Sequence, residues 1–260
     1  FQEVAKFRAV RRMWARIMKE RFGAENPRSQ MCRFHTQTGG VTLAAQQPEN
    51  NIVRVALQGF AAVCGGTQSL HTNGFDEALA LPSERAARIA VRTQQVLAAE
   101  SGAADTVDPF AGSYYVEALT DEIEERAQEL IDKVEEMGGS VECIPFIRGE
   151  VEQSAWGYEE RYRIKQDIVV GVNEYVTDDI DDVEVLRVDP ESERDQVERL
   201  KKFKENRDQE LVDKRLEELR EVAKGEGNLL HPIRAALKDN ATLGEVSGVM
   251  RDEFGEYSEA

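Results

Sequence analysis

The sequence predicts an α/β fold organised around one strand–helix–strand unit at residues 32–81. Two segments, residues 33–40 and 65–78, each carry a polar run that we expect at the end of a strand. The stretch between them begins at Asn50 and is almost wholly apolar, which is typical of a buried crossover helix on a parallel sheet. Because parallel strands end at the same edge, we expect both polar runs to meet at one rim, where α/β barrels place their chemistry.

An amphipathic helix is expected before this unit, over residues 1–22. Its large apolar residues recur with the helical period and so share one face. They are Val4, Phe7, Val10, Trp14, Ile17 and Phe22. Gly23 and the pair Asn26-Pro27 end the helix. Phe1 is neither an initiator methionine nor a helix cap, so we expect further sequence upstream of it.

Further helices are expected after the unit. Ser83 is predicted to cap a helix over about residues 84–100, which Gly102 closes. Residues 107–115 contain Asp-Pro and Ala-Gly-Ser and are expected to form a loop, after which Thr120 caps the next helix.

The segment that follows is more polar. A helix is predicted over residues 148–165, with Tyr158 and Tyr162 on its inward face and therefore in the core. The apolar run Ile168–Val172 predicts a short strand or a buried extended segment.

The composition changes again toward the end of the chain. Residues 178–184 are acidic and offer little to bury, which predicts a linker. Two helices are expected near residues 191–206 and 208–224. Thr242 and Glu245 fit a capping box, which predicts the start of a last helix.

The net charge excludes some classes of partner. Over 260 residues, 50 Asp and Glu oppose 33 Lys and Arg, and the formal net charge is −17. Such an acidic protein is not expected to bind nucleic acid or anionic membranes. The 3 cysteines are scattered and form no C-x-x-C motif, which favours a reduced cytoplasmic protein without disulfides or a zinc site. No stretch of the sequence approaches the length of a membrane span.

Three motifs carry a resemblance to a known family. They are His35–Gly40 (HTQTGG), Gln46–Ala56 (QQPENNIVRVA) and Gly65–Pro82 (GGTQSLHTNGFDEALALP). Together they resemble the catalytic, large subunit of the methylmalonyl-CoA mutase family, and the similarity extends more weakly from residue 1 to about residue 257. The resemblance implies the C-terminal part of a (β/α)8 TIM barrel over residues 1–175, followed by a helical extension over residues 176–260. Because such a barrel closes with eight strands, we expect its missing N-terminal portion upstream.

The resemblance also implies an activity. Members of this family are isomerases that use adenosylcobalamin for a radical 1,2-rearrangement of an acyl-CoA, and we expect conversion of methylmalonyl-CoA to succinyl-CoA. The sequence contains no Asp-x-His-x-x-Gly motif, so a cobalamin-binding domain is expected elsewhere, as a separate subunit. We expect the chain to be inactive without this partner and without the missing barrel portion.

Two alternatives stay open. Val41 stands where many methylmalonyl-type enzymes carry Trp, which favours archaeal or isobutyryl-type branches and leaves an isobutyryl-CoA mutase-type enzyme as one alternative. The other alternative is an inactive fragment or a non-catalytic assembly subunit, against which the intact motif residues argue.

The resemblance assigns cofactor-binding roles to several residues. Gln37 and Gly40 would face the corrin ring, where a flat macrocycle needs the close backbone approach that glycine allows. Asn73 and Glu77 would hold the adenosyl ribose, because a carboxylate can accept hydrogen bonds from both ribose hydroxyls. His71 would line the same pocket.

Gln68, on the expected second strand, would contact the acyl-CoA substrate. Structural roles compete with these assignments, since an amide such as Gln37 can satisfy loop backbone and Glu77 can act as a charge at a helix N-terminus. His35 and His71 lack a third ligand at a suitable spacing, so we expect no metal site.

Overall fold

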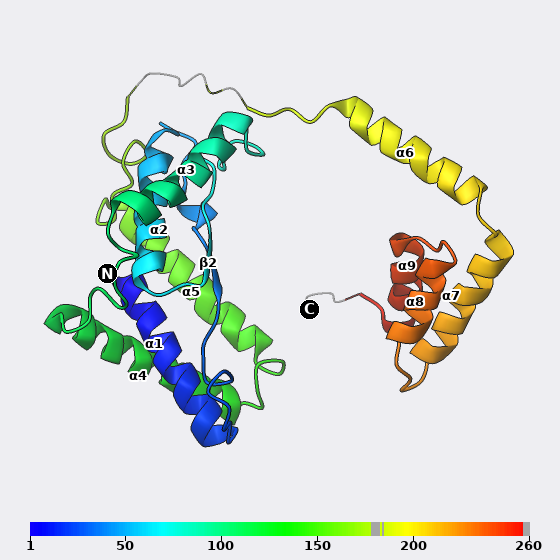
Figure 1. Ribbon diagram of the computed structural model, residues 1–260, viewed down its shortest axis with the longest axis horizontal. Coiled ribbons are helices and arrows are strands. Elements are labelled where there is room, and N and C mark those ends of the chain that lie inside the picture. Colours follow the sequence, from blue (N-terminus) through cyan, green and yellow to red (C-terminus); the bar gives the residue numbers. More distant parts are fainter. Residues whose placement is uncertain (178–182, 184, 257–260) are drawn as a thin grey trace. The chain divides into compact units, whose positions relative to one another are not determined.

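The computed structural model describes residues 1–177, 183 and 185–256. The chain divides into two compact units, Phe1–Arg187 and Val188–Ala260, which Figure 1 colours from blue to yellow-green and from yellow to red. Apart from Val183, the acidic linker expected at residues 178–184 lies outside the described residues. The division into a partial barrel and an extension at residue 175 stays a prediction.

The first unit is mainly helical and contains a small parallel sheet, which confirms the α/β class. Strand β1 (His35–Gln37) pairs in parallel with β2 (Ser69–His71), and Gln37 lies opposite His71. Helix α2 (Asn50–Cys64) connects the strands, and α3 (Glu84–Glu100) follows β2 and packs on α2. The expected strand–helix–strand unit is therefore present, and both strands end at the same edge.

The strands lie inside the polar runs rather than ahead of them, contrary to expectation. Each is short, and its first and last residues are exposed. Backbone pairing between the strands, which side-chain polarity does not encode, sets where they begin and end. As a consequence Gln68 precedes β2, whereas Asn73 and Glu77 follow it.

Helix α2 is only partly covered in this unit, so the prediction of burial on most sides is wrong here. Val55 and Gly59 are buried, and a Cβ on Gly59 would stand 2.9 Å from the Leu97 side chain of α3. On the other face, Val53 and Leu57 are 61% and 67% exposed. These two residues line an open cavity of about 770 Å³.

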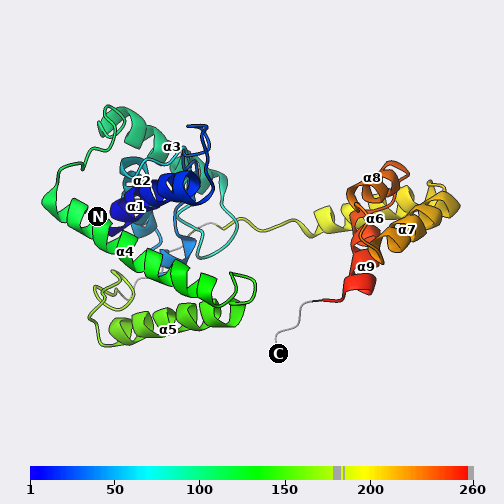
Figure 2. The same cartoon turned by 90° about the horizontal axis from the view of Figure 1, so that it is seen from below.

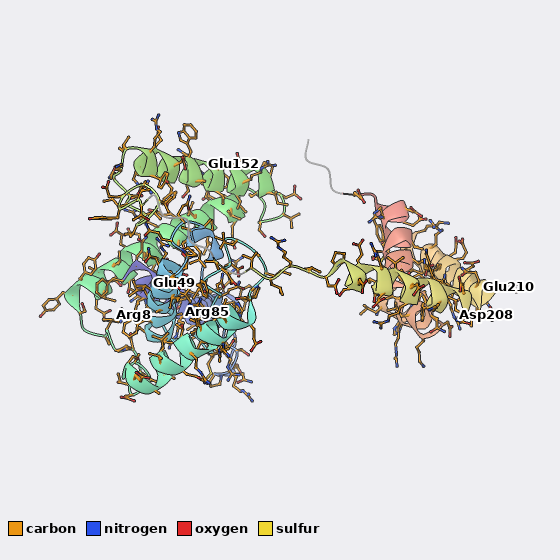
Figure 3. The ribbon with its side chains drawn as sticks, turned by 90° about the horizontal axis from the view of Figure 1, so that it is seen from above. Arg8, Glu49, Arg85, Glu152, Asp208 and Glu210 are labelled. Carbon is orange, nitrogen blue, oxygen red and sulfur yellow. The ribbon has the colours of Figure 1, made fainter. Side chains whose placement is uncertain are left out.

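The predicted start of α3 is confirmed. The Ser83 hydroxyl accepts a hydrogen bond from Ala86 N at 3.2 Å, which satisfies one free amide of the first turn. In the same turn Arg85 donates from Nη2 to Oε1 of Glu49, the residue before α2, at 3.1 Å. Figure 3 shows this pair, which ties the N-terminal ends of α2 and α3 together.

Helix α1 (Gln2–Arg16) continues through a π-helical turn, Ile17–Arg21, and lies beside α4 (Tyr114–Glu136), as Figure 2 shows. Arg8 joins the two helices by donating to Glu117 Oε1 at 2.7 Å, and this hydrogen bond raises the pKa of the arginine. Its other guanidinium nitrogens donate to the Asp108 carboxylate and the Thr120 hydroxyl, both at 2.9 Å.

The predicted start of α4 at Thr120 is wrong. The helix already begins at Tyr114, and the Thr120 hydroxyl donates to Val116 O at 2.6 Å within it. Tyr114 and Tyr115 are 95% and 64% exposed and only Val116 of the first turn is buried, so the start of the helix shows little apolar periodicity.

Helix α5 (Ile144–Arg163) begins before the predicted residue 148, with Pro145 in its first turn. The placement of Tyr158 and Tyr162 in the core is wrong. The two rings stack with centroids 6.4 Å apart, Tyr158 is 47% exposed, and both side chains line the 770 Å³ cavity.

The prediction of a short strand or a buried extended segment at Ile168–Val172 is also wrong. These residues turn, and Gly171 N donates to Glu174 O at 2.8 Å. Ile168 and Val170 are about half exposed, because their apolar side chains face the same cavity instead of a neighbouring strand.

The second unit is helical. Helix α6 (Pro190–Glu205) precedes three packed helices, α7 (Gln209–Ala223), α8 (Leu230–Lys238) and α9 (Leu243–Phe254), as Figure 1 shows. The predicted helices near 191–206 and 208–224 are confirmed as α6 and α7, whereas α8 is an element that the sequence pattern did not indicate. The buried core comprises Val212, Leu219, Ala236, Ala241, Val246 and Val249.

Two helices of this unit, α7 and α9, begin at a side chain that caps the first turn. Asp208, labelled in Figure 3, accepts from Leu211 N at 3.0 Å and begins α7. The predicted capping box of α9 is confirmed, because Glu245 N donates to the Thr242 hydroxyl and the Glu245 carboxylate accepts from Thr242 N.

Three further observations concern the part of the chain that the structure describes. There, no helix is long and apolar enough to cross a membrane. No group of three or more His, Cys, Asp or Glu side chains within the described ranges could hold a metal ion. Cys32, Cys64 and Cys143 are free thiols.

Candidate functional site

The site is built where β1 and β2 end, and a buried threonine joins the two ends. Thr38 N donates to His71 O at 3.1 Å, which extends the strand pairing by one residue. The Thr38 hydroxyl accepts from Asn73 N at 3.0 Å. Thr38 is 4% exposed, so these bonds are shielded from water and fix the two strand ends against each other.

Four of the predicted cofactor residues lie together beyond this join. Gln37 Nε2 donates to Asn73 Oδ1 at 3.3 Å. A Cβ on Gly40 would stand 2.9 Å from Asn73 Nδ2 and 3.5 Å from Glu77 Cγ, so the glycine allows the two loops to approach. Residues remote in the sequence therefore form one cluster, which we call the rim cluster: Gln37, Gly40, Asn73 and Glu77.

The rim cluster holds an unused hydrogen-bond donor. Asn73 is 2% exposed, and its Nδ2 has no hydrogen-bond partner among the described residues. A buried polar group without a partner costs free energy, about 1–3 kcal/mol. Beside it, Glu77 is exposed and presents a carboxylate acceptor. The cluster can thus donate to and accept from a ligand that carries hydroxyl groups.

The loop after β2 is held by two further side chains. Asp76 is fully buried, and its Oδ2 accepts from Ser83 N at 2.8 Å. The Thr72 hydroxyl donates to Ala90 O of α3 at 2.7 Å. These bonds anchor the segment that carries Asn73 and Glu77 to the start and middle of α3.

The loop after β1 is held by α2. Gly39 N donates to Gln58 Oε1 at 2.7 Å, and Gln58 Nε2 donates to the Thr42 hydroxyl at 2.6 Å. Thr38 and Gln58 were not singled out from the sequence, because a buried threonine and a helical glutamine give no local sign of which loop they contact.

The histidines differ in position. His71 is exposed at the carboxyl end of β2, at the same edge as the rim cluster. His35 begins β1, and its Nδ1 forms a hydrogen bond with the Ser69 hydroxyl at 2.7 Å, which is the structural role that competes with a ligand role.

The structure places Gln68 apart from the rim cluster. It lies at the amino end of β2, where its Oε1 accepts from Phe34 N and its Nε2 donates to Gly66 O, both at 2.8 Å. Gln68 lines a cavity of about 630 Å³ together with Arg11 and Arg33. Its amide keeps one donor and one acceptor position for a ligand in that cavity.

Most charged side chains that line this second cavity are positively charged. Its four arginines include Arg8, which is paired with carboxylates on α4 and before it, and Arg11, whose closest hydrogen-bond acceptor is Gly65 O at 3.5 Å. Burial raises the pKa of the Cys32 thiol in the same cavity, against the influence of Arg11, so the thiol stays protonated at neutral pH.

Comparison with known proteins gives a consistent set of relatives. The model of the family described as methylmalonyl-CoA mutase matches residues 1–256. The large subunit of 2-hydroxyisobutanoyl-CoA mutase from Aquincola tertiaricarbonis is 44% identical over 100% of this chain and 47% of its own length. Human mitochondrial methylmalonyl-CoA mutase is 44% identical over 99% of this chain and 35% of its own length. Methylmalonyl-CoA mutase from Rhizobium meliloti is 43% identical over 99% of this chain and 37% of its own length. The chain thus spans less than half the length of these relatives.

Proposed function

Because the chain belongs to the methylmalonyl-CoA mutase family, we propose that it forms part of the catalytic subunit of an adenosylcobalamin-dependent acyl-CoA mutase. The relatives are mutases, which are isomerases, and members of this family use adenosylcobalamin. The observation that carries the proposal is the rim cluster, in which Gln37, Gly40, Asn73 and Glu77 meet at the carboxyl edge of the sheet.

The rim cluster fits the adenosyl part of the cofactor. The unpartnered Nδ2 of Asn73 can donate to a ribose hydroxyl, and the exposed Glu77 carboxylate can accept from ribose hydroxyls. Gly40 leaves room for close approach, since any larger side chain would reach Asn73. Gln37 and His71 lie at the same edge and complete the proposed binding set.

Adenosylcobalamin, when bound, supplies the radical chemistry of a 1,2-rearrangement. The protein binds and orients the reactants and excludes water, which would otherwise give side reactions. In this chain, Asn73 and Glu77 would hold the ribose, and Gln37 and Gly40 would lie against the corrin ring.

The fold that we propose for the complete subunit is a (β/α)8 barrel. The described residues include one parallel strand pair with its crossover helix, and a barrel needs eight strands. The exposed Val53 and Leu57 of α2 support this proposal, because further barrel elements would cover them. We propose that the second unit is the helical extension of that barrel.

We propose methylmalonyl-CoA as the substrate and succinyl-CoA as the product. Gln68 would contact the acyl-CoA, and its cavity supports this role because Arg11 and Arg33 can pair with phosphate groups. The relatives named for methylmalonyl-CoA and for 2-hydroxyisobutanoyl-CoA are equally similar to the chain, so overall identity does not distinguish these two substrates.

The proposed partner is a separate cobalamin-binding subunit or domain. The relative from Aquincola tertiaricarbonis is named a large subunit, which supports a mutase of more than one polypeptide. The cytoplasmic location stays a prediction.

The proposal is tested with the full-length subunit that contains this chain, mixed with its cobalamin-binding partner. We expect the mixture to bind adenosylcobalamin, seen in its visible absorbance, and to convert methylmalonyl-CoA to succinyl-CoA. Binding of the cofactor without turnover of methylmalonyl-CoA would contradict the proposed substrate. Failure to bind the cofactor in any mixture would contradict the proposed function itself.

A further inference from the structure

A single buried side chain holds both loops of the rim cluster. Asn51 lies in the first turn of α2 and is 0% exposed. Its Nδ2 donates to Ala44 O at 2.8 Å and to Phe75 O at 2.9 Å. Its Oδ1 accepts from Ala44 N at 3.1 Å and from Arg54 Nη1 at 2.7 Å. An asparagine side chain has two N–H donors and two acceptor positions, so every one of them is used.

The two backbone segments that Asn51 contacts are those that carry the rim cluster. Ala44 follows the short 3-10 helix Gly40–Thr42, and Phe75 lies between Asn73 and Glu77. Residues 44 and 75 belong to different loops, which are otherwise joined at their starts by Thr38. Asn51 therefore joins the two loops a second time, further from the strand ends, at residues that Thr38 does not contact.

These contacts differ from those of an ordinary residue at a helix start. Such a residue accepts from free amides of its own helix, whereas the hydrogen bonds of Asn51 to the backbone all go to the two loops. Gln58, further along α2, contacts only the loop after β1. Among these side chains of α2, Asn51 is the one that links both loops.

We propose that Asn51 is a positioning residue for adenosylcobalamin binding, which acts by fixing the Gly40 loop against the Asn73–Glu77 loop. This inference rests on the proposed function, because the rim cluster is the proposed cofactor contact. Asn51 does not touch the cofactor itself, since it is buried beneath the loops that do. Its loss should therefore weaken cofactor binding more than substrate binding, because Gln68 lies at the opposite end of β2.

The test is Asn51→Asp in the full-length subunit assembled with its cobalamin-binding partner. The variant keeps the acceptor oxygen and the size but loses both donors, so the carbonyls of Ala44 and Phe75 are left without a partner. We expect the dissociation constant of adenosylcobalamin to rise about tenfold, which corresponds to roughly 1.4 kcal/mol. The dissociation constant of the acyl-CoA should stay within about twofold of wild type.

A matched control is Asn173→Asp. Asn173 has the same pattern of contacts, since its Oδ1 accepts from Val169 N and its Nδ2 donates to the carbonyls of Tyr162 and Asp167. Asn173 holds a turn that carries no residue of the rim cluster. The variant Asn173→Asp should therefore lower the midpoint of thermal unfolding without a selective loss of cofactor affinity. A purely structural role of Asn51 would give the same result as this control.

The outcomes separate the inference from the proposed function. Wild-type enzyme that does not bind adenosylcobalamin overturns the proposed function. The positioning role is overturned if wild type binds adenosylcobalamin and Asn51→Asp binds it with the same affinity. It is also overturned if Asn51→Asp loses affinity for the cofactor and for the acyl-CoA to the same extent. If Asn51→Asp does not fold, Asn51→Ser, which retains one donor, takes its place. The inference then requires that amide hydrogen exchange at residues 39–44 and 73–77 is faster in Asn51→Ser than in Asn173→Asp. Equal exchange rates in the two variants overturn it.

Discussion

Gly40 and Asn73 are so close that a Cβ on the glycine would stand 2.9 Å from the amide nitrogen of the asparagine. Asn73 is buried and is held through Thr38 and Gln37, so it has little freedom to move away. The short approach between the two loops thus depends on the absence of a side chain at position 40.

The first prediction concerns Gly40→Ala. The added methyl group should displace Asn73 and weaken adenosylcobalamin binding by the assembled enzyme about tenfold, since overpacking of this kind costs 1–3 kcal/mol. Gly39→Ala is the matched control, because a Cβ there would have its closest neighbour at 3.7 Å. Equal cofactor affinity in the two variants would show that the approach at Gly40 has no part in binding.

The second prediction concerns the Glu77 carboxylate. Glu77→Gln removes the charge while retaining the shape, and we expect adenosylcobalamin affinity to fall about tenfold to a hundredfold, because hydrogen bonds to a charged group contribute about 1.5–3 kcal/mol. Binding is measured by titration of the cofactor absorbance. Glu84→Gln makes the same change at an exposed position at the start of α3 and should bind as wild type does. Glu77 lies in the turn before α3 and not at a helix start, so wild-type affinity in Glu77→Gln would show that its carboxylate has no part in cofactor binding.

The third prediction concerns acid stability of the second unit. The Arg207 guanidinium donates to both oxygens of Glu245, at 2.6 and 2.7 Å, and holds the pKa of that carboxyl far below its usual value of 4.5. A depressed pKa stabilises the folded state above the pKa of the unfolded chain and loses this contribution as the pH falls. Wild type should therefore lose stability progressively as the pH decreases below about 4.5.

The variant Glu245→Gln tests this relation. At pH 7 it should lower the free energy of unfolding by about 2 kcal/mol, because Arg207 is left buried without its charged partner. The difference from wild type should shrink as the pH falls, which chemical denaturation at several pH values measures. Glu226→Gln, at an exposed position, is the control and should match wild type. A difference that is constant with pH would contradict the assigned cause.

The fourth prediction concerns the core of the same unit. Leu219 is 0% exposed among the helices α7, α8 and α9, so Leu219→Ala should lower the free energy of unfolding by about 2–5 kcal/mol through the cavity that it creates. Leu230→Ala removes the same atoms where the side chain is 71% exposed, and it should cost less than about 0.5 kcal/mol. Similar losses in the two variants, measured by thermal or chemical denaturation, would show that Leu219 is not a core residue.

Local signals predicted helix starts well where the interaction is confined to one turn. Ser83 caps α3 and Thr242 with Glu245 caps α9 as expected, because these hydrogen bonds join residues three apart in the sequence. Thr120 has the same local appearance, yet it lies inside α4, since a threonine hydroxyl can bond to the preceding turn as well as cap the next one.

Burial was predicted less well, because it depends on which elements face each other. Tyr158, Tyr162 and the run Ile168–Val172 were assigned to core or strand on their apolar character, but in the structure they line a cavity. The same holds for Val53 and Leu57 of α2. Apolar periodicity identifies the face of a helix that favours burial. It does not show whether another element of the described chain packs against that face.

The identity of the rim residues was available from the sequence, because the motifs HTQTGG and GGTQSLHTNGFDEALALP contain them at fixed spacing. Their meeting at one edge was also expected, since a parallel strand–helix–strand unit ends both strands on the same side. The contacts between these residues, in contrast, could be seen only in the tertiary structure. The strand register sets Gln37 opposite His71, Thr38 joins the strand ends, and Asn51 holds the two loops through carbonyls that are remote in sequence. Contacts of this kind follow from backbone pairing and burial in three dimensions, which no local pattern of side chains encodes.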